Sequence, residues 1–137
     1  MKKNAKILVI DDDPDFVEAV TIILESKNYK VISASDPTGG LEMILSEEPD
    51  LILLDIMMES VFDGFSLCHK IKSSSKYKKY CHVPIIMISA VKNQAGFRFG
   101  FNGLDQGMSK PDLYLDKPVK PKHLLVSVEN LLKEKNN

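Results

Sequence analysis

The stretch Ile7-Leu8-Val9-Ile10-Asp11-Asp12-Asp13-Pro14 joins a short apolar run directly to three acidic residues and a proline. An apolar run of this length is typical of a buried strand. An Asp-Pro pair starts a helix because aspartate caps free backbone N–H groups and proline suits the first helical position. The stretch therefore predicts a strand at about Lys6–Ile10 that passes into a helix, with Asp11 and Asp12 in the turn between them.

The same alternation of short apolar runs and segments of helical period recurs along the chain. Further strands are predicted at Lys30–Ala34, Asp50–Asp55, Val83–Ser89 and Asp112–Asp116. Asp36-Pro37 predicts a second helix start, with Leu41, Ile44 and Leu45 on its buried face, and the last helix runs from about Pro121 to Lys133. This alternation is typical of an α/β fold with a parallel sheet.

One segment departs from the alternation. A right-handed crossover between the fourth and fifth strands needs a connection of a dozen or more residues, usually a helix. The stretch Val91–Pro111 contains four glycines and few strong helix formers. We therefore expect a short or irregular fourth helix there, flanked by long loops.

Length and charge restrict the class of protein. The 137 residues fit a single domain over 1–137, with a core at about 6–132. The 18 basic and 19 acidic residues nearly cancel, which argues against a strong field for direct nucleic-acid or membrane binding. The chain has no signal peptide pattern and no apolar run as long as a membrane span. We expect a cytoplasmic protein.

Five polar side chains lie where predicted strands end: Asp11, Asp12, Asp55, Ser89 and Lys117. The carboxyl ends of parallel strands meet at one edge, where open α/β sheets bind ligands. Crowded carboxylates repel one another and a hard cation relieves that repulsion, so oxygen ligands here favour Mg²⁺, which Mn²⁺ could replace. Asp55 is the candidate nucleophile, with Lys117 as a point charge and Ser89 as a hydroxyl donor.

Each of these residues also has a common structural role. An aspartate after a strand often caps a helix or is solvated, and a lone lysine or serine is usually a surface residue. It is the joint arrangement, at successive strand ends, that favours a functional site. Three histidines are scattered without metal-ligand spacing.

Four motifs in order resemble a known family. They are Ile7-Leu8-Val9-Ile10-Asp11-Asp12-Asp13-Pro14, Asp50-Leu51-Ile52-Leu53-Leu54-Asp55-Ile56-Met57-Met58, Pro84-Ile85-Ile86-Met87-Ile88-Ser89-Ala90 and Tyr114-Leu115-Asp116-Lys117-Pro118. Together they look like the receiver domain of bacterial two-component response regulators, the CheY-like domain. The resemblance implies a three-layer, flavodoxin-like (βα)5 fold with a parallel five-stranded sheet in the order 2-1-3-4-5.

The resemblance also implies roles for the acidic residues. Asp55 would accept a phosphoryl group from the phosphohistidine of a sensor histidine kinase or a phosphotransfer protein. Asp12 would bind Mg²⁺ directly and Asp11 through water, with Asp55 and the backbone carbonyl of Met57 also at the metal.

Two further roles concern switching. Ser89 would be the hydroxyl that turns toward the phosphoryl group, and Tyr114 the aromatic residue that moves inward on activation. Lys117 would contact a phosphoryl oxygen, and in the resting state Asp55. The peptide bond Lys117–Pro118 would be cis, an isomer that proline makes accessible.

The chain departs from the family pattern in two places. Glu59 stands where a proline is usual, four residues after Asp55, and the Asp63-Gly64 pair falls one residue late. The loop Met58–Phe62 should therefore have its own shape, with Glu59 near the phosphorylation site. The segment Val91–Pro111 is also longer than usual, so the surface for partners is expected to be particular to this chain.

These observations predict a phosphorylation-dependent signalling switch rather than an enzyme. The output would be exerted on a downstream partner protein, unless the chain is part of a larger hybrid protein, and phosphorylation could produce a homodimer. One alternative is a degenerate receiver that only mediates binding. Another is a Mg²⁺-dependent phosphatase with an aspartyl intermediate, although Ile56 and Met57 leave no Asp-x-Asp pair after Asp55.

Overall fold

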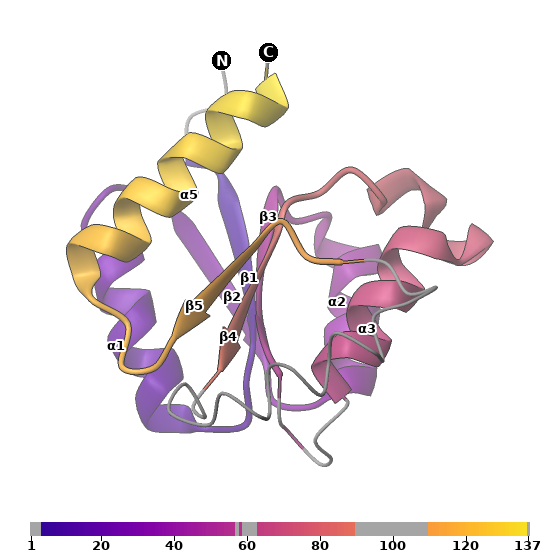
Figure 1. The fold of residues 1–137 in the computed structure, drawn as a ribbon, viewed down its shortest axis with the longest axis horizontal. Coiled ribbons are helices and arrows are strands. Elements are labelled where there is room, and N and C mark those ends of the chain that lie inside the picture. Colours follow the sequence, from indigo (N-terminus) through magenta and orange to yellow (C-terminus); the bar gives the residue numbers. More distant parts are fainter. Residues whose placement is uncertain (1–3, 57, 59–62, 90–109, 137) are drawn as a thin grey trace.

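A parallel five-stranded sheet with helices on both faces forms the architecture (Figure 1). The computed structural model describes residues 4–56, 58, 63–89 and 110–136. The strands β1 (Lys6–Ile10), β2 (Lys30–Ala34), β3 (Leu51–Asp55), β4 (Ile85–Ser89) and β5 (Leu113–Asp116) pair in the order β2-β1-β3-β4-β5. The helices are α1 (Pro14–Glu25), α2 (Pro37–Glu47), α3 (Asp63–Ser73), the 3₁₀ helix η1 (Ser75–Tyr80) and α5 (Pro121–Asn136). The α/β fold and strand order predicted from the sequence are confirmed.

Alternation along the three central strands divides the core into two layers. Side chains at Leu8, Ile52 and Ile85 point to the layer shared with α2, α3 and η1. Their neighbours Ile7 and Leu51 point to the opposite layer, shared with α1 and α5. Every residue of β3 and β4 is buried, and all but the last residue of each strand, Asp55 and Ser89, are apolar. Such apolar runs are typical of parallel strands covered on both faces.

Two aspartates start helices as their sequence context predicts. The carboxylate of Asp13 accepts a hydrogen bond from the N–H of Asp15 at 3.0 Å, and α1 begins at Pro14. The carboxylate of Asp36 accepts from the N–H of Gly39 at 2.6 Å, and α2 begins at Pro37. Both carboxylates satisfy N–H groups that lack partners within the helix.

The structure corrects two details of the sequence reading. Leu45, predicted on the buried face of α2, is 39% exposed, while Ile44 beside it is fully buried. The polar and basic stretch after α3 is not a plain surface segment, because it folds into η1, where Tyr77 and Tyr80 are buried against the α2–α3 layer. The fourth-helix region expected at Val91–Pro111 lies outside the described residues, except for its last two.

Gly64 brings α3 into direct contact with the backbone that follows β3. Its N–H donates to the carbonyl of Ile56 at 2.9 Å. A Cβ atom at this position would lie 2.6 Å from the carbonyl oxygen of Asp55 and 2.6 Å from the Cα of Ile56. Since both neighbours are backbone atoms, neither can rotate away, and the absent side chain fixes how closely α3 approaches Asp55.

We predict that Gly64→Ala destabilises the protein, although helix propensity alone would favour alanine by about 1 kcal/mol. The backbone clash should reverse that gain and cost about 1–3 kcal/mol in the free energy of unfolding. Urea denaturation followed by circular dichroism measures it. The matched control is Ser66→Ala, at an exposed position of the same helix, which should change stability little. An unfolding midpoint for Gly64→Ala at or above that of the parent protein would show that the backbone adapts freely.

Candidate functional site at the carboxyl edge of the sheet

Three predicted metal ligands come together at the carboxyl edge of the sheet. Because β1 and β3 pair in parallel with Ile10 opposite Leu54, the residues that follow, Asp11 and Asp55, are neighbours. One carboxylate oxygen from each of Asp11, Asp12 and Asp55 lies within 4.8 Å of the other two. Asp11 and Asp55 are only 3% and 5% exposed, while Asp12 is exposed. The cluster thus combines two buried carboxylates with one that faces solvent.

Lys117 provides positive charge beside this cluster. Its N–H donates to the carbonyl of Ser89 at 2.8 Å, which extends the β4–β5 pairing by one residue. Its Nζ lies 3.0 Å from Asp11 Oδ2 and 4.0 Å from Asp55 Oδ2. In this structure the ammonium is therefore closer to Asp11 than to Asp55. The peptide bond between Lys117 and Pro118 is cis, as predicted.

Asp11 differs from the structural aspartates of this chain. The carboxylates of Asp50 and Asp112, which precede β3 and β5, accept from the backbone N–H of Lys6 at 2.7 Å and of Ile85 at 2.8 Å. Asp11 Oδ1 likewise accepts from the N–H of Asp13 at 2.9 Å. Its Oδ2, however, is buried without a hydrogen-bond partner among the described residues and lies 3.0 Å from Lys117 Nζ in an ion pair. Burying a carboxylate oxygen that accepts no hydrogen bond is costly, and one ion pair compensates that cost only in part.

The oxygen atoms present suit a hard divalent cation. Three carboxylates and one lysine leave the cluster with excess negative charge, and carboxylate oxygens are the ligands that Mg²⁺ takes from proteins. The Oδ2 of Asp11, which accepts no hydrogen bond from the described residues, is an acceptor that a cation could use within the cluster. The chemistry of these residues therefore fits a magnesium site.

The two predicted switch residues lie on neighbouring strands. Ser89 ends β4, is 2% exposed, and stands opposite Asp116 in the β4–β5 pairing. Tyr114, in β5, is half-buried against the α2–α3 layer, with its ring centroid 6.4 Å from that of Phe65. Met57 and Glu59, also expected at the site, lie outside the described residues.

Phe16 is a site residue that the sequence reading missed. It lies in α1 and packs beside the α1–α5 layer, as an apolar residue of that helix should. The Nζ of Lys117 also lies 4.3 Å from the centroid of its ring, within range of a cation–π interaction. No signal in a single sequence connects residues 16 and 117, because the contact depends on the fold.

The fold and the cluster together define a class of protein. A doubly wound parallel sheet carries acidic residues after β1 and at the end of β3, a hydroxyl at the end of β4 and a lysine after β5, which is the arrangement of a receiver-type signalling domain. The chain belongs to the response regulator family, and residues 7–129 match its receiver domain. Receiver domains of response regulators are generally signalling modules rather than enzymes.

Curated relatives support the same family. The DNA-binding dual master transcriptional regulator RpaA of Synechocystis sp. is 34% identical over 128 residues, covering 93% of this chain and 49% of the relative. The response regulator PleD of Caulobacter vibrioides is 34% identical over 132 residues, covering 96% of this chain and 27% of the relative. The chain thus spans about half the length, or less, of these relatives.

Solved structures share the fold over nearly the whole chain. A putative response regulator from Chloroflexus aurantiacus has a TM-score of 0.78 and 27% identity, covering 96% of this chain and 99% of its own. A CheY-like receiver domain protein from Methanospirillum hungatei has a TM-score of 0.76 and 28% identity, covering 96% of each chain.

Within the described residues, no helix has the length and apolar character needed to cross a membrane.

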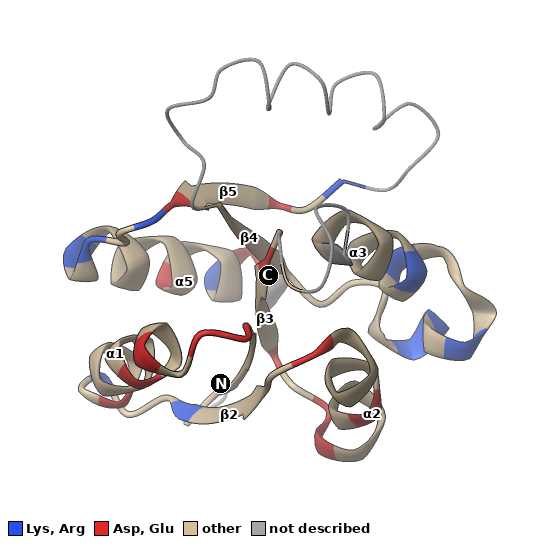
Figure 2. Ribbon diagram, turned by 90° about the horizontal axis from the view of Figure 1, so that it is seen from below, with Lys and Arg blue, Asp and Glu red and all other residues tan. Residues whose placement is uncertain are grey.

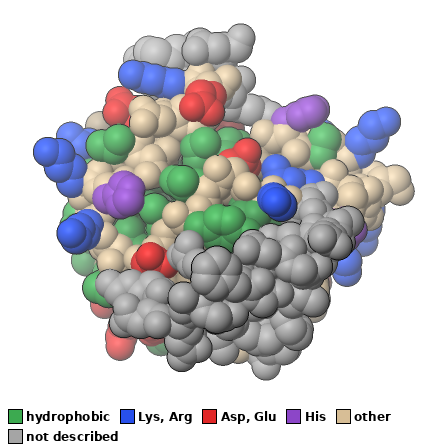
Figure 3. All heavy atoms as spheres, in the orientation of Figure 1, with side chains coloured by type: hydrophobic (Ala, Val, Ile, Leu, Met, Phe, Trp, Pro, Cys, Tyr) green, Lys and Arg blue, Asp and Glu red, His purple; other side chains and the backbone are tan. Residues whose placement is uncertain are grey.

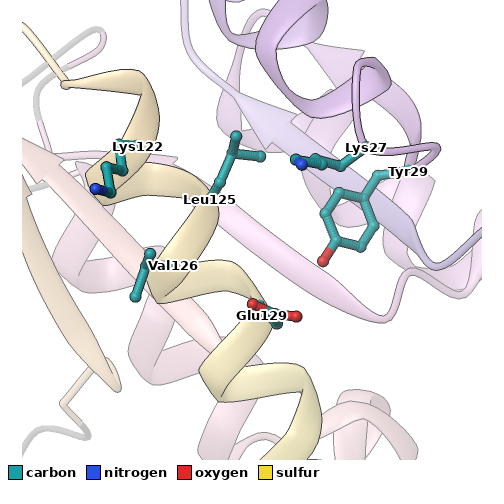
Figure 4. Close-up of a pocket in the computed structure, with 6 residues that line it drawn as sticks. All are labelled: Lys27, Tyr29, Lys122, Leu125, Val126 and Glu129. Carbon is teal, nitrogen blue, oxygen red and sulfur yellow. The ribbon is translucent and has the colours of Figure 1, made fainter.

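A separate hollow lies away from the acidic cluster, between α5 and the turn before β2 (Figure 4). Its volume is about 540 Å³, and it is lined by Lys27, Tyr29, Lys122, Leu125, Val126 and Glu129. Burial raises the pKa of the Tyr29 hydroxyl above its usual value, and the Glu129 carboxylate raises it further.

We predict that Glu129→Gln lowers the pKa of Tyr29 only part of the way toward the usual value of about 10, because burial is the larger cause. The ring signals of Tyr29 in an NMR pH titration measure this. Glu134→Gln, at an exposed position of the same helix, should leave the pKa of Tyr29 unchanged. The folded state holds the Tyr29 hydroxyl proton more tightly than the unfolded state does. The resulting contribution to the free energy of unfolding is therefore fully present below pH ~10 and is lost as pH rises through the raised pKa. A Tyr29 pKa that returns fully to its usual value in Glu129→Gln would contradict the dominance of burial.

Proposed function

We propose that this receiver domain accepts a phosphoryl group on Asp55 from the phosphohistidine of a sensor histidine kinase or phosphotransfer protein. The modified domain then changes its affinity for a downstream output protein. The observation that carries the proposal is the buried grouping of Asp11 and Asp55 beside Asp12 and Lys117 at the carboxyl edge of the sheet. A cytoplasmic location, where such kinase domains act, is part of the same proposal.

Asp55 is the best placed of the three carboxylates to act as nucleophile. It ends the central strand β3, and the backbone around it is held by α3 through Gly64 and by β4 through the Ile56 N–H, which donates to the Ile88 carbonyl at 3.0 Å. One of its oxygens would form the new bond to phosphorus while the bond from phosphorus to the histidine nitrogen breaks. The leaving imidazole takes the electron pair of that bond, and the product is an acyl phosphate.

Mg²⁺ would be held by Asp11, Asp12 and the Met57 carbonyl, and Asp55 would also lie at the metal. When bound, this ion would neutralise charge on the phosphoryl oxygens. Lys117 would supply a second positive charge to the same oxygens. For that, its ammonium must leave Asp11, and its present position between Asp11 and Asp55 makes the required movement short.

Ser89 and Tyr114 would transmit the event. The Ser89 hydroxyl, at the end of the strand beside β3, would donate to the phosphoryl group as it turns. Ser89 ends β4, and β4 pairs with β5, where Tyr114 lies opposite Met87. A shift at the end of β4 can therefore reach the half-buried ring of Tyr114. A phosphoryl group that makes better contacts in one conformation of β4 and β5 than in the other shifts the population toward that conformation.

Phosphorylation tests the proposal directly. With Mg²⁺ and phosphoramidate, we expect the parent protein to gain one phosphoryl group, seen as a mass shift of the intact protein and mapped to Asp55. Asp55→Asn should abolish the shift and remain folded, since the two side chains are nearly isosteric. Asp13→Asn is the matched control, because asparagine caps a helix as well as aspartate does, and it should be labelled normally. Absence of labelling in the parent protein would favour a module that only mediates binding.

Metal binding gives an independent test. Asp12→Ala should weaken Mg²⁺ binding by about tenfold to a hundredfold, the loss that follows when a supporting group of a metal site is removed. Isothermal titration calorimetry measures the affinity without any phosphodonor. Since Asp12 is exposed, its replacement should leave the unfolding midpoint nearly unchanged. An unaltered Mg²⁺ affinity would remove Asp12 from the metal site.

A further inference from the structure

The charges of this chain, nearly balanced in total, are strongly segregated along the sequence. Residues 11–63 contain 14 acidic and 2 basic side chains, whereas residues 64–104 contain 7 basic and no acidic ones. Figure 2 shows the corresponding separation in space, with acidic positions on α1, α2 and the turn after β1, and lysines on α3 and η1. We call the surface of α1 and α2 the acidic side and that of α3 and η1 the basic side, while α5 carries charges of both signs.

The basic side is formed by five lysines of α3 and η1, which we call the α3–η1 surface: Lys70, Lys72, Lys76, Lys78 and Lys79. Lys70, Lys76 and Lys78 are exposed and make no ion pair with any described residue, whereas Lys72 pairs with Asp112 at 3.4 Å. In the space-filling view, lysines project from this end of the molecule (Figure 3). Three of these five lysines are therefore not neutralised by any described acidic residue.

Buried tyrosines hold this surface in place. Tyr77 and Tyr80 are 4% and 8% exposed, so η1 is anchored at two positions three residues apart. The Tyr80 hydroxyl donates to Glu48 at 3.3 Å, and Lys79 pairs with the same carboxylate at 3.0 Å. The ammonium groups of Lys76 and Lys79 lie 5.9 and 5.8 Å from the tyrosine ring centroids. A segment ordered before it binds loses less conformational entropy on docking.

We propose that the α3–η1 surface docks the acidic side of a second copy of this chain. The proposal commits to this occupant because its complement is present in the molecule: α1 and α2 carry exposed acidic residues that include Glu25 and Glu42. Stacking aromatic rings or exposed apolar residues would favour nucleic acid or a membrane, but here both tyrosines are buried beneath the lysines. The proposal does not rest on phosphorylation of Asp55.

The geometry of this contact is head-to-tail. Two different surfaces meet, so each copy keeps one free surface of each kind, and association continues as concentration rises. Exposed charges attract over about a Debye length, which falls from roughly 20 Å at about 20 mM salt to roughly 6 Å at about 300 mM salt. The association is therefore strongly dependent on ionic strength.

Sedimentation equilibrium of the full chain tests the proposal. At low salt the weight-average mass should rise above the monomer mass of 15.4 kDa as concentration increases, and return to it at high salt. Lys70→Glu with Lys78→Glu should lower the association constant by at least about tenfold, because like charges then face each other. These two lysines are exposed and lie outside the tyrosine contacts, so circular dichroism should show an unchanged fold.

A matched control separates surface complementarity from net charge. Lys27→Glu with Lys30→Glu makes the same change in net charge but replaces the two basic residues of the acidic part of the sequence. This variant should associate as strongly as the parent or more strongly. A charge swap completes the test: Glu25→Lys with Glu42→Lys should be monomeric alone, yet associate when mixed with the Lys70→Glu, Lys78→Glu variant.

Three outcomes would overturn the proposal. The parent protein could remain monomeric at low salt at every concentration. Both double lysine variants could lose association equally, which would make net charge the cause. Monomeric protein that binds phosphatidylglycerol vesicles or duplex DNA through Lys70 and Lys78 would assign the surface to a membrane or to nucleic acid instead.

Discussion

The register between β1 and β3 is the constraint on which the site depends. Pairing Ile10 with Leu54 makes Asp11 and Asp55 neighbours at the end of the sheet, and both are almost fully buried. Burying a carboxylate is expensive unless it gains a partner. Among the described residues, the positive charge beside these carboxylates is that of Lys117, which follows β5. The fold therefore concentrates negative charge at a point where a divalent cation would be strongly favoured.

The rest of the fold holds that crowded edge rigidly. Gly64 lets α3 contact the backbone of Asp55 and Ile56. The Lys117 N–H donates to the Ser89 carbonyl, so the backbone at Asp55 and the backbone at Ser89 are each held by a neighbouring segment. At the opposite edge, Asp50 and Asp112 accept from backbone N–H groups of neighbouring strands. The same residue type thus stabilises the amino edge and supplies reactive oxygens at the carboxyl edge. The carboxylates at the amino edge accept from N–H groups of neighbouring strands, whereas those at the carboxyl edge are grouped with one another beside Lys117.

The features that could be predicted from the sequence are those that depend on local signals. Strand ends follow from apolar runs, and Asp13 and Asp36 follow from the cap-and-proline pattern, because both signals are local. The grouping of Asp11, Asp12 and Asp55 was also predictable, since parallel strands share one edge. The Phe16–Lys117 contact, the buried tyrosines of η1 and the exposure of Leu45 were not. Each depends on which helix face meets which layer, and residues far apart in sequence decide that.

Charge segregation relates the candidate site to the rest of the surface. Asp11, Asp12 and Asp55 belong to the acidic part of the sequence, so the repulsion that favours a cation at the site and the field that would attract a basic surface have the same source. A cation bound at the cluster would reduce that field, and a docked basic surface would reduce the repulsion. By linkage, each event must weaken the other to the same degree, to the extent that they share this electrostatic term. Ionic strength would screen the long-range attraction between copies far more than the short-range contacts within the cluster. Metal affinity and self-association should consequently respond to salt with different steepness, which separates the local carboxylate chemistry from the field of the whole molecule.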